Sequence, residues 1–295
     1  MPDPVREQKI VVGDHSLSVR EAGDLGGKPL VYFHGTPSCR LEPAFADDLA
    51  AELGIRLISF DRPGYGESPP VPFSLASIAR DTGLVADELG LDRFVTIGQS
   101  GGGPFSLACG AVLGERVTRV GVTAGAGPFQ EVPGLPDLLD DNDRAAVALL
   151  PDEAAAARQF AVGFEPFREL GRAADADILA GFKQMSSRRD GELLDQPANG
   201  SALAAAMRAA LVQGTSGAGW DNVAWVGPWD IDLGAIRQPV FLWYGDEDTF
   251  MAPVAGEWLD QNLPTATLVM RAGEGHMGVM EHTREILETL SYLPS

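Results

Sequence analysis

The segment Gly98–Gly102 (GQSGG) directly follows the short apolar run Phe94–Ile97 and constrains the fold more than any other part of the chain. A G-x-S-x-G sequence between a strand and a helix is typical of a sharp turn that exposes a serine hydroxyl at the top of a sheet. Pro104 is tolerated in the first turn of the helix that should follow. We therefore predict that Ser100 is a nucleophile. The alternative is a glycine-rich turn whose serine only caps the helix.

Apolar runs with the character of strands lie on both sides of this turn. The expected strands are Lys9–Val12 and Leu17–Glu21, which would form a hairpin, then Leu30–Phe33, Arg56–Phe60, Phe94–Ile97, Val117–Val122, Pro239–Tyr244 and Thr267–Met270. The expected helices between and after them are Pro43–Gly54, Leu75 to Leu89, Gly102 to about Leu113, and Glu281–Leu290. Such alternation predicts an α/β fold with a mostly parallel central sheet and helices on both faces.

The middle of the chain, residues 128–235, lacks strand-like runs and is rich in alanine, with proline and glycine breaks. The candidate helices there are Asp137–Leu150, Glu153–Leu170, Asp175–Arg188 and Ser201–Val212. We expect a core formed by residues 1–127 and 236–295, with 128–235 inserted as a helical cap. A separate helical domain is the alternative, and the strands that flank the segment on both sides argue against it.

Length and charge narrow the class of protein. A chain of 295 residues fits one large domain, or a core with an insertion, better than several small domains. The 22 basic and 42 acidic residues give a net charge of −20, which disfavours nucleic acid and anionic membranes as partners. We expect a small-molecule substrate, and the sequence leaves the oligomeric state open.

Cysteine usage and hydropathy add little beyond this. Cys39 and Cys109 are too few for a disulfide framework, and their surroundings lack metal-ligand spacing, so we expect no metal and no cofactor. The N-terminal residues lack the apolar region of a signal peptide, and no apolar stretch approaches 18 residues. These features predict a cytoplasmic protein.

A serine hydroxyl needs a base to take its proton and a third group to orient that base. Four histidines are available. His15 falls in the expected hairpin turn and His282 in the first turn of the last helix, where neither needs a function. His276 stands in a glycine-rich loop directly after an expected strand, where catalytic side chains are commonly presented. We predict that His276 is the base.

The orienting acid should also follow a strand. The segment Gly245–Asp248 (GDED) comes directly after Pro239–Tyr244 and offers three carboxylates. Spacing favours Asp248 only slightly over Asp246. The resulting order of serine, aspartate and histidine along the chain is the one found in α/β-hydrolases.

Acyl transfer also needs N–H donors for the oxyanion. One candidate is the N–H of Gly101, directly after the nucleophile. The other is the N–H of Thr36 in the segment His34–Pro37 (HGTP), because Pro37 has no donor. We expect His34 to shape this loop through hydrogen bonds and not to carry protons.

Together these motifs resemble the α/β-hydrolase superfamily in its cap-bearing branch. The resemblance rests on His34–Pro37, Asp61–Ser68 (DRPGYGES), Gly98–Gly102, Gly245–Asp248 with Pro253, and Gly275-His276, which follow one another in the family's order over almost the whole chain. It implies that the acid is Asp248 and that the segment 61–64 is a structural turn. A serine nucleophile separates the chain from haloalkane dehalogenases and epoxide hydrolases. The HGTP loop also differs from the HGGG and HGGP loops of other branches.

The resemblance implies a serine hydrolase, which we expect to act on a small to medium, neutral or apolar carboxylic ester. The same groups could instead cleave a C–C bond of a β-diketone or an amide, or form a peracid. A binding protein that keeps a vestigial triad is the alternative from another functional class. Eight aromatic residues fall in the expected cap, and we expect about a third of them to touch substrate: Phe129, Phe160, Phe164, Phe167, Phe182, Trp220, Trp225 and Trp229.

Overall fold

A twisted eight-stranded sheet runs through the computed structural model, which describes residues 3–291. The strands are β1 (Arg6–Val12), β2 (His15–Gly23), β3 (Lys28–Phe33), β4 (Ile55–Phe60), β5 (Phe94–Gln99), β6 (Val117–Thr123), β7 (Val240–Gly245) and β8 (Ala266–Arg271). Their order is β1-β2-β4-β3-β5-β6-β7-β8. β2 is antiparallel to both β1 and β4, and every other neighbouring pair is parallel. The predicted fold class and all eight expected strands are confirmed.

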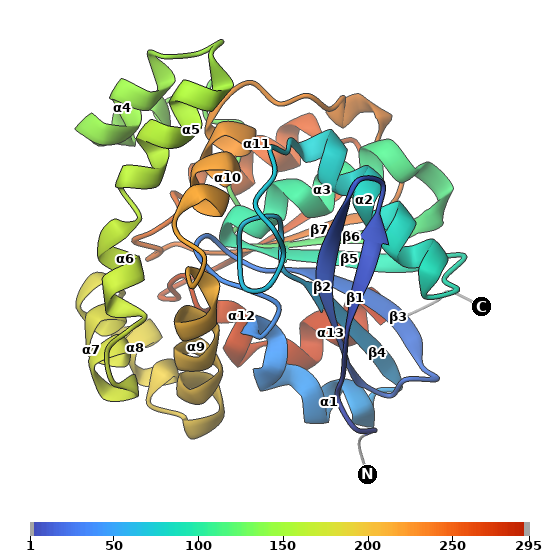
Figure 1. The fold of residues 1–295 in the computed structure, drawn as a ribbon. Coiled ribbons are helices and arrows are strands. Elements are labelled where there is room, and N and C mark those ends of the chain that lie inside the picture. The colour runs from blue at the N-terminus through green and yellow to red at the C-terminus, as the bar shows by residue number, and fades with distance from the viewer. Residues whose placement is uncertain (1–2, 292–295) are drawn as a thin grey trace.

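Helices cover both faces of the sheet (Figure 1). One face carries α2 (Leu75–Glu88), α3 (Gly103–Leu113) and α11 (Val254–Asn262), and the other carries α1 (Asp47–Glu52), α12 (Gly278–Glu281) and α13 (Thr283–Ser291). Each face has its own buried apolar cluster. α2 shows why these segments pack as they do. Leu75, Ile78, Thr82 and Val85 recur at helical spacing and are all buried against the sheet.

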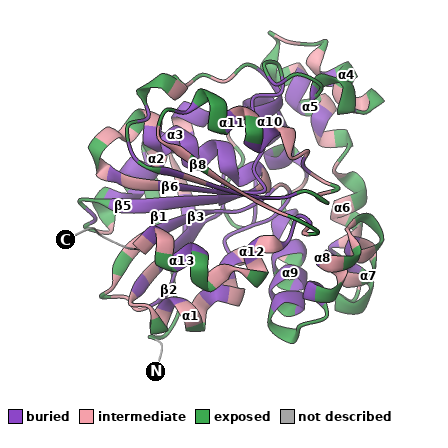
Figure 2. Ribbon diagram, turned by 180° about the vertical axis from the view of Figure 1, so that it is seen from behind, coloured by how far each residue is buried: buried purple, intermediate pink, exposed green. Residues whose placement is uncertain are grey.

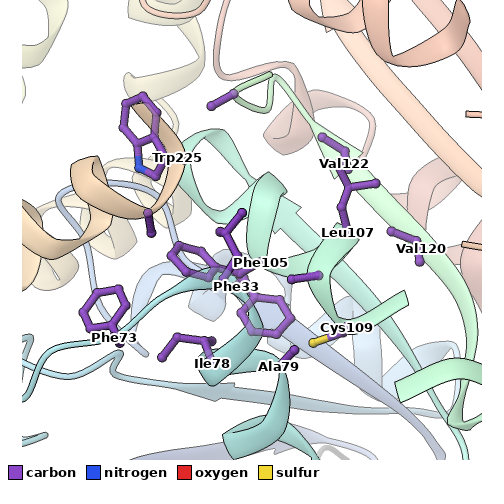
Figure 3. Close-up of a cluster of buried hydrophobic side chains, with 14 of the residues drawn as sticks. Phe33, Phe73, Ile78, Ala79, Phe105, Leu107, Cys109, Val120, Val122 and Trp225 are labelled. Carbon is purple, nitrogen blue, oxygen red and sulfur yellow. The ribbon is translucent and has the colours of Figure 1, made fainter. Parts of the chain in front are cut away.

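The larger cluster extends beyond the sheet and its helices (Figure 3). Phe33 of β3 stacks on Phe105 of α3 with ring centroids 6.5 Å apart. Trp225 belongs to the same cluster and comes from helix α10 (Ser216–Val226), which lies far from β3 and α3 in the sequence. The apolar core therefore anchors α10 firmly to the sheet domain.

Residues 128–235, here called the helical insertion, lie between β6 and β7 and contain no strand. Its helices are α4 (Asp141–Val147), α5 (Glu153–Val162), α6 (Glu165–Leu170), α7 (Asp175–Met185), α8 (Arg188–Leu194), α9 (Pro197–Ala210) and α10. α4 to α9 stand at one end of the sheet, on the left in Figure 1. Burial differs sharply along the insertion: α10 is almost wholly buried, whereas α6 and α7 turn exposed residues outward (Figure 2).

Several helix predictions were too long. The expected helix Glu153–Leu170 is two helices, α5 and α6, because Pro166 in a helix interior would remove a backbone hydrogen bond and must stand in a first turn. Pro43–Gly54 begins with a 3₁₀ turn, Glu42–Ala46, which also carries its proline in the first turn, and only then becomes α1. Asp175–Arg188 stops at Met185, because Ser186 is extended and Ser187 caps the next helix.

Other helix limits were shifted or missed. The segment Asp137–Leu150 holds a 3₁₀ turn and then α4, which starts at Asp141 because the Asp140 side chain caps it. The predicted Ser201–Val212 corresponds to α9, which starts earlier, with Pro197 in its first turn. Glu281–Leu290 is interrupted at His282, so that α12 and α13 are separate. The sequence analysis did not identify α8, α10 and α11 as helices.

Two further observations concern the described residues as a whole. Within residues 3–291, none of the helices has both the length and the apolar character needed to cross a bilayer. Cys39 and Cys109 are free thiols in the interior. Burial raises the pKa of the Cys109 thiol to about 12, so this group is not a nucleophile near neutral pH.

Candidate active site

Ser100 occupies a strained turn between β5 and α3. Its φ of +55° lies in the left-handed region, which a residue with a side chain rarely adopts. Ser100–Gly102 form a single 3₁₀ turn before α3 starts at Gly103. The turn is so tight that a Cβ on Gly98 would lie 2.1 Å from the carbonyl oxygen of Gly102. This is the local geometry expected for a serine presented at the end of a strand.

His276 and Asp248 meet although they come from different loops. Asp248 follows β7 and His276 follows β8, and the Nδ1 of His276 lies 2.8 Å from the Oδ2 of Asp248. The other oxygen of Asp248 accepts the backbone N–H groups of Phe250 and Met251 at 2.8 and 2.9 Å. The Asp248 side chain is completely buried. Its carboxylate is therefore held in place on both sides.

Asp246, the other candidate acid, points elsewhere. It is exposed, and its carboxylate accepts the backbone N–H of Gly273 at 2.7 Å. That bond closes the turn between β7 and the loop after β8. Asp248 is therefore the aspartate that lies beside the imidazole, and Asp246 is a turn residue.

The surroundings of His276 favour its charged form. Burial alone would lower the pKa of the imidazole, but the charge and hydrogen bond of Asp248 outweigh burial and raise the pKa above its ordinary value of 6.5. Asp190 and Glu42 add to this effect through their charges. A hydrogen bond to Asp248 also directs the proton to Nδ1, which leaves Nε2 as the acceptor in the neutral ring.

Ser100 and His276 line one cavity of about 730 Å³, including the space at its open mouth. Most of the wall is apolar: Phe45, Phe167, Phe182, Leu203, Met207, Phe250, Met277, Val279 and Met280. Of the eight aromatic residues of the insertion, Phe167 and Phe182 lie in this wall. Phe129 instead packs on Trp225 with ring centroids 5.4 Å apart, and Phe160 is buried in the main core. The sequence analysis overlooked Phe45 and Phe250, which come from the sheet domain.

Glu42 contributes an acidic side chain to the wall of this cavity, and no sequence motif pointed to it. Its Oε1 accepts the Tyr32 hydroxyl at 2.8 Å, and both of its oxygens lie 3.1 Å from the backbone N of Gly35. Burial raises the pKa of this carboxyl, although its hydrogen bonds and the Arg62 charge oppose the shift. The site thus contains a carboxyl group close to Ser100 in addition to Asp248.

The loop His34–Thr36 after β3 is fixed by hydrogen bonds to its backbone. The Gly35 carbonyl oxygen lies 2.8 Å from His34 Nδ1 and accepts from Arg62 Nη2 at 3.1 Å. Because the Gly35–Thr36 peptide bond is trans, the Thr36 N–H points away from that carbonyl. The Thr36 side chain lies against Gly101, since a Cβ on Gly101 would come within 2.3 Å of the Thr36 hydroxyl oxygen. The two residues whose N–H groups are predicted to bind the oxyanion are thus close neighbours.

His34 has the environment of a structural residue. It is fully buried, and burial followed by the Arg62 charge lowers the pKa of its imidazole well below the ordinary value. The neutral ring contacts the Gly35 carbonyl oxygen with Nδ1 and accepts the Arg62 backbone N–H with Nε2 at 3.3 Å. The ring therefore ties the loop after β3 to the turn after β4.

The remaining histidines lie away from the cavity. His15 is not simply an exposed turn residue: its Nε2 lies 3.2 Å from Asp81 of α2. His282 pairs with Glu274 at 2.7 Å. Glu274, Glu281 and His282 bring three metal-ligand atoms within 4.8 Å of one another. Glu281 is engaged with Arg189, so the cluster is explained by ion pairs and we assign no metal to it.

Comparisons with known proteins agree on the fold. The family model described as "alpha/beta hydrolase fold" matches residues 28–283. A bromoperoxidase from Bacillus anthracis superposes with a TM-score of 0.70 at 20% identity, over 97% of this chain and 98% of the other. A thermophilic esterase from Thermogutta terrifontis gives 0.66 at 20% identity, over 96% of both chains.

An enol-lactonase from Burkholderia xenovorans gives a TM-score of 0.68 at 18% identity, over 96% of this chain and 97% of the other. The search of curated proteins found no match. At such low identity, the structural likenesses establish the fold and leave the substrate open.

Proposed function

The chain belongs to the α/β-hydrolase fold family, and from that premise we propose that it is a serine hydrolase that cleaves carboxylic esters through an acyl-enzyme. Ser100 is the nucleophile, His276 the general base and Asp248 the group that orients the imidazole. The observation that carries this proposal is the 2.8 Å contact between His276 and Asp248 at a cavity that Ser100 also lines. A buried acid, an imidazole and a strained serine at one cavity are what acyl transfer requires.

In the first half-reaction, the Ser100 oxygen forms a bond to the acyl carbon while its proton moves to Nε2 of His276. The electron pair of the carbonyl bond moves onto the oxygen, and the N–H groups of Thr36 and Gly101 stabilise this oxyanion. The carbonyl then re-forms, the bond to the leaving oxygen breaks, and His276 gives its proton to that oxygen, which leaves as the alcohol. Asp248 stabilises the imidazolium in between.

In the second half-reaction, water replaces the alcohol. His276 takes a proton from the water, whose oxygen attacks the acyl carbon of the Ser100 ester. Collapse of the second tetrahedral intermediate breaks the bond to Ser100, and the proton on His276 goes to the serine oxygen. The products are a carboxylic acid and the regenerated enzyme, and the cycle requires no cofactor.

The cavity wall suggests the kind of ester. Its aromatic, leucine and methionine side chains favour a small to medium, neutral or apolar acyl group. Phe167, Phe182, Leu203 and Met207 come from the helical insertion, so we propose that residues 128–235 act as the cap that shapes the substrate site. The esterase and lactonase names among the structural neighbours agree with this class. Cytoplasmic location and a small molecule as the partner stay predictions.

Fluorophosphonate labelling followed by peptide mass spectrometry tests the nucleophile directly. We expect covalent modification at Ser100 in the parent protein and none in Ser100→Ala. The same substitution should lower turnover of an activated ester such as p-nitrophenyl butyrate by roughly 10³-fold or more. Ser106, a buried serine of α3, supplies the matched control through Ser106→Ala. An unreactive Ser100 in a folded protein would favour a binding protein and refute the hydrolase.

A further inference from the structure

Asp221 of α10 connects the helical insertion to the loop that carries Thr36. Its carboxylate accepts from Arg62 Nε at 2.8 Å and from Nη2 at 2.6 Å, a two-pronged ion pair. The hydroxyls of Thr36 and Tyr65 each donate to the same carboxylate at 2.6 Å. Asp221 and Arg62 are both completely buried. Four hydrogen bonds therefore converge on one carboxylate of the insertion.

Arg62, which Asp221 holds in place, also contacts the backbone of this loop. Besides Asp221, its guanidinium donates to the carbonyl oxygens of His34 at 2.6 Å and Gly35 at 3.1 Å. The Gly35 carbonyl lies in the peptide plane whose opposite side carries the Thr36 N–H, and the His34 carbonyl lies in the preceding plane. The orientation of one proposed oxyanion donor thus depends on a salt bridge whose acid comes from the insertion.

Asp190 of α8 makes the corresponding connection to the histidine loop. Its Oδ2 accepts the backbone N–H of His276 at 3.0 Å, and its Oδ1 accepts that of Met277 at 2.7 Å. The approach is close enough that a Cβ on Gly275 would lie 2.2 Å from Asp190 Oδ2. Asp190 is completely buried. Asp248 orients the imidazole ring, and Asp190 holds the backbone from which the ring projects.

Stability alone does not explain why these two acidic side chains are buried. Burying a charge removes its hydration at a large cost in free energy, and apolar residues of similar volume often stabilise a fold as well or better. Other acids of the insertion, such as Asp175 and Glu169, stand at its surface in exposed ion pairs. Asp190 and Asp221 differ from them in that each is buried and each ends on a loop with a predicted catalytic group.

We propose that Asp190 and Asp221 are positioning residues for the reaction: the insertion holds the histidine loop through one and the oxyanion loop through the other. The insertion is then part of the catalytic machinery as well as a wall of the substrate cavity. This inference rests on the proposed hydrolase activity, because it assigns a catalytic consequence to each contact. The contacts themselves predict that both loops are held rigidly, whether or not an ester is the substrate.

The test uses the full chain and the isosteric variants Asp190→Asn and Asp221→Asn, with Asp175→Asn as the exposed control from the same insertion. Kinetics with p-nitrophenyl butyrate separate kcat from KM. Hydrogen–deuterium exchange, read by mass spectrometry on peptides covering residues 34–38 and 275–279, reports on the order of each loop independently of activity.

We expect kcat to fall about 30- to 100-fold in each variant with KM within about threefold. Loss of one oxyanion donor costs roughly 10²- to 10³-fold, and a displacement of about 1 Å costs on the order of 10²-fold. In Asp221→Asn, exchange should accelerate in residues 34–38 and stay unchanged in residues 275–279. In Asp190→Asn, it should accelerate in residues 275–279 and stay unchanged in residues 34–38. The control should match the parent in both measurements.

Milder substitutions decide the matter if an Asn variant fails to fold. Tyr65→Phe removes the other hydroxyl that donates to Asp221 and leaves Thr36 in place, so kcat should fall about tenfold and exchange in residues 34–38 should rise. Ser187→Ala removes the hydroxyl that accepts the Asp190 backbone N–H at 3.1 Å, and it should loosen residues 275–279. Parent-like kcat and exchange in Tyr65→Phe would refute the role of Asp221, and unchanged exchange in Ser187→Ala would refute that of Asp190.

Three results separate the two proposals. If the parent hydrolyses the ester but both loops keep their exchange and kcat stays within threefold in the Asn variants, the positioning role is wrong and the hydrolase stands. If exchange rises equally in both loops in each variant, the insertion is merely destabilised, and the positioning role is again wrong. If the parent neither turns over ester nor reacts with fluorophosphonate, the hydrolase fails and with it the catalytic role assigned to both acids.

Discussion

The sheet domain and the helical insertion contribute to the site in different ways. The sheet domain carries the proposed reacting groups: Ser100 at the end of β5, and Asp248 and His276 in the loops after β7 and β8. The insertion supplies apolar wall and two buried carboxylates, Asp190 and Asp221, whose hydrogen bonds end on the loops of the sheet domain. In our proposal, the sheet domain presents the reacting groups and the insertion holds their loops in place.

The effect of a buried carboxylate on this site depends on which group it contacts. Asp248 and Asp190 both lie near His276, yet one contacts the ring and the other contacts only backbone. A carboxylate on the ring controls the tautomer and stabilises a charge that forms in the reaction, whereas a carboxylate on the backbone controls geometry. Losing the first should therefore cost more activity than losing the second.

The largest expected effect belongs to Asp248→Asn. An amide in place of the carboxylate favours the wrong tautomer of His276 and removes the charge that stabilises the imidazolium, so kcat/KM should fall about 10³- to 10⁴-fold. Asp246→Asn is the matched control two residues away and should stay within about threefold. Steady-state kinetics on an activated ester measure both. Equal losses would abolish the distinction between Asp246 and Asp248.

The next effect is on stability and concerns the insertion. Asp221→Ala leaves the Arg62 guanidinium buried without its partner, which should lower the free energy of unfolding by about 3–5 kcal/mol. Asp175→Ala removes a surface partner of Arg208 and should leave the urea midpoint close to that of the parent. Equilibrium unfolding in urea compares the two. Similar midpoints would mean that the buried network contributes no more than a surface pair.

The two regions also differ in how well the sequence reveals them. Ser100, Asp248 and His276 lie in short motifs at strand ends, and those strands are readable because their apolar runs are short and bounded by glycine or proline. The expected strands agree with the structure, and the predicted His276 and Asp248 lie side by side. Their catalytic roles stay predictions until Ser100 is shown to react.

No comparable sequence motif marks Asp190 or Asp221. They are two of 42 acidic residues, on helices that the sequence pattern did not identify, and only long-range packing buries them. Glu42 is similar, since nothing near it in the chain shows that it would face Ser100. The predicted helix limits in the insertion were wrong for local reasons. At Pro166, for example, the prediction overlooked that a new helix begins. Periodicity finds elements, but it does not find partners across the fold.

The pH dependence of kcat/KM should show both regions acting on one imidazole. In the proposed mechanism the neutral His276 ring accepts the Ser100 proton. Because the pKa of His276 is raised, activity should fall about tenfold per pH unit on an acid limb that begins above pH 6.5. Asp190→Asn removes a negative charge that favours the imidazolium. The limb should therefore move to lower pH, while Asp175→Asn leaves it in place. A limb that stays or moves upward in Asp190→Asn would show that Asp190 does not act on the ring electrostatically.

The smallest expected effect concerns Glu42, which belongs to the sheet domain yet resembles the insertion's acids in being held by hydrogen bonds. Its carboxylate lies in the cavity wall, so it should favour a cationic substrate over a neutral one of the same shape. A butyrate ester of choline and its 3,3-dimethylbutyl counterpart differ only in that charge. In Glu42→Gln the ratio of their kcat/KM values should fall by roughly fivefold, the equivalent of about 1 kcal/mol for a screened interaction across the cavity.

The ratio of the two kcat/KM values should also fall in the parent as pH drops, because burial raises the Glu42 pKa and the carboxyl becomes neutral at a higher pH than an exposed one. A ratio that is the same in parent and variant would mean that the Tyr32 and Gly35 hydrogen bonds fully occupy this carboxylate, and Glu42 would then act only on the structure of the loop after β3.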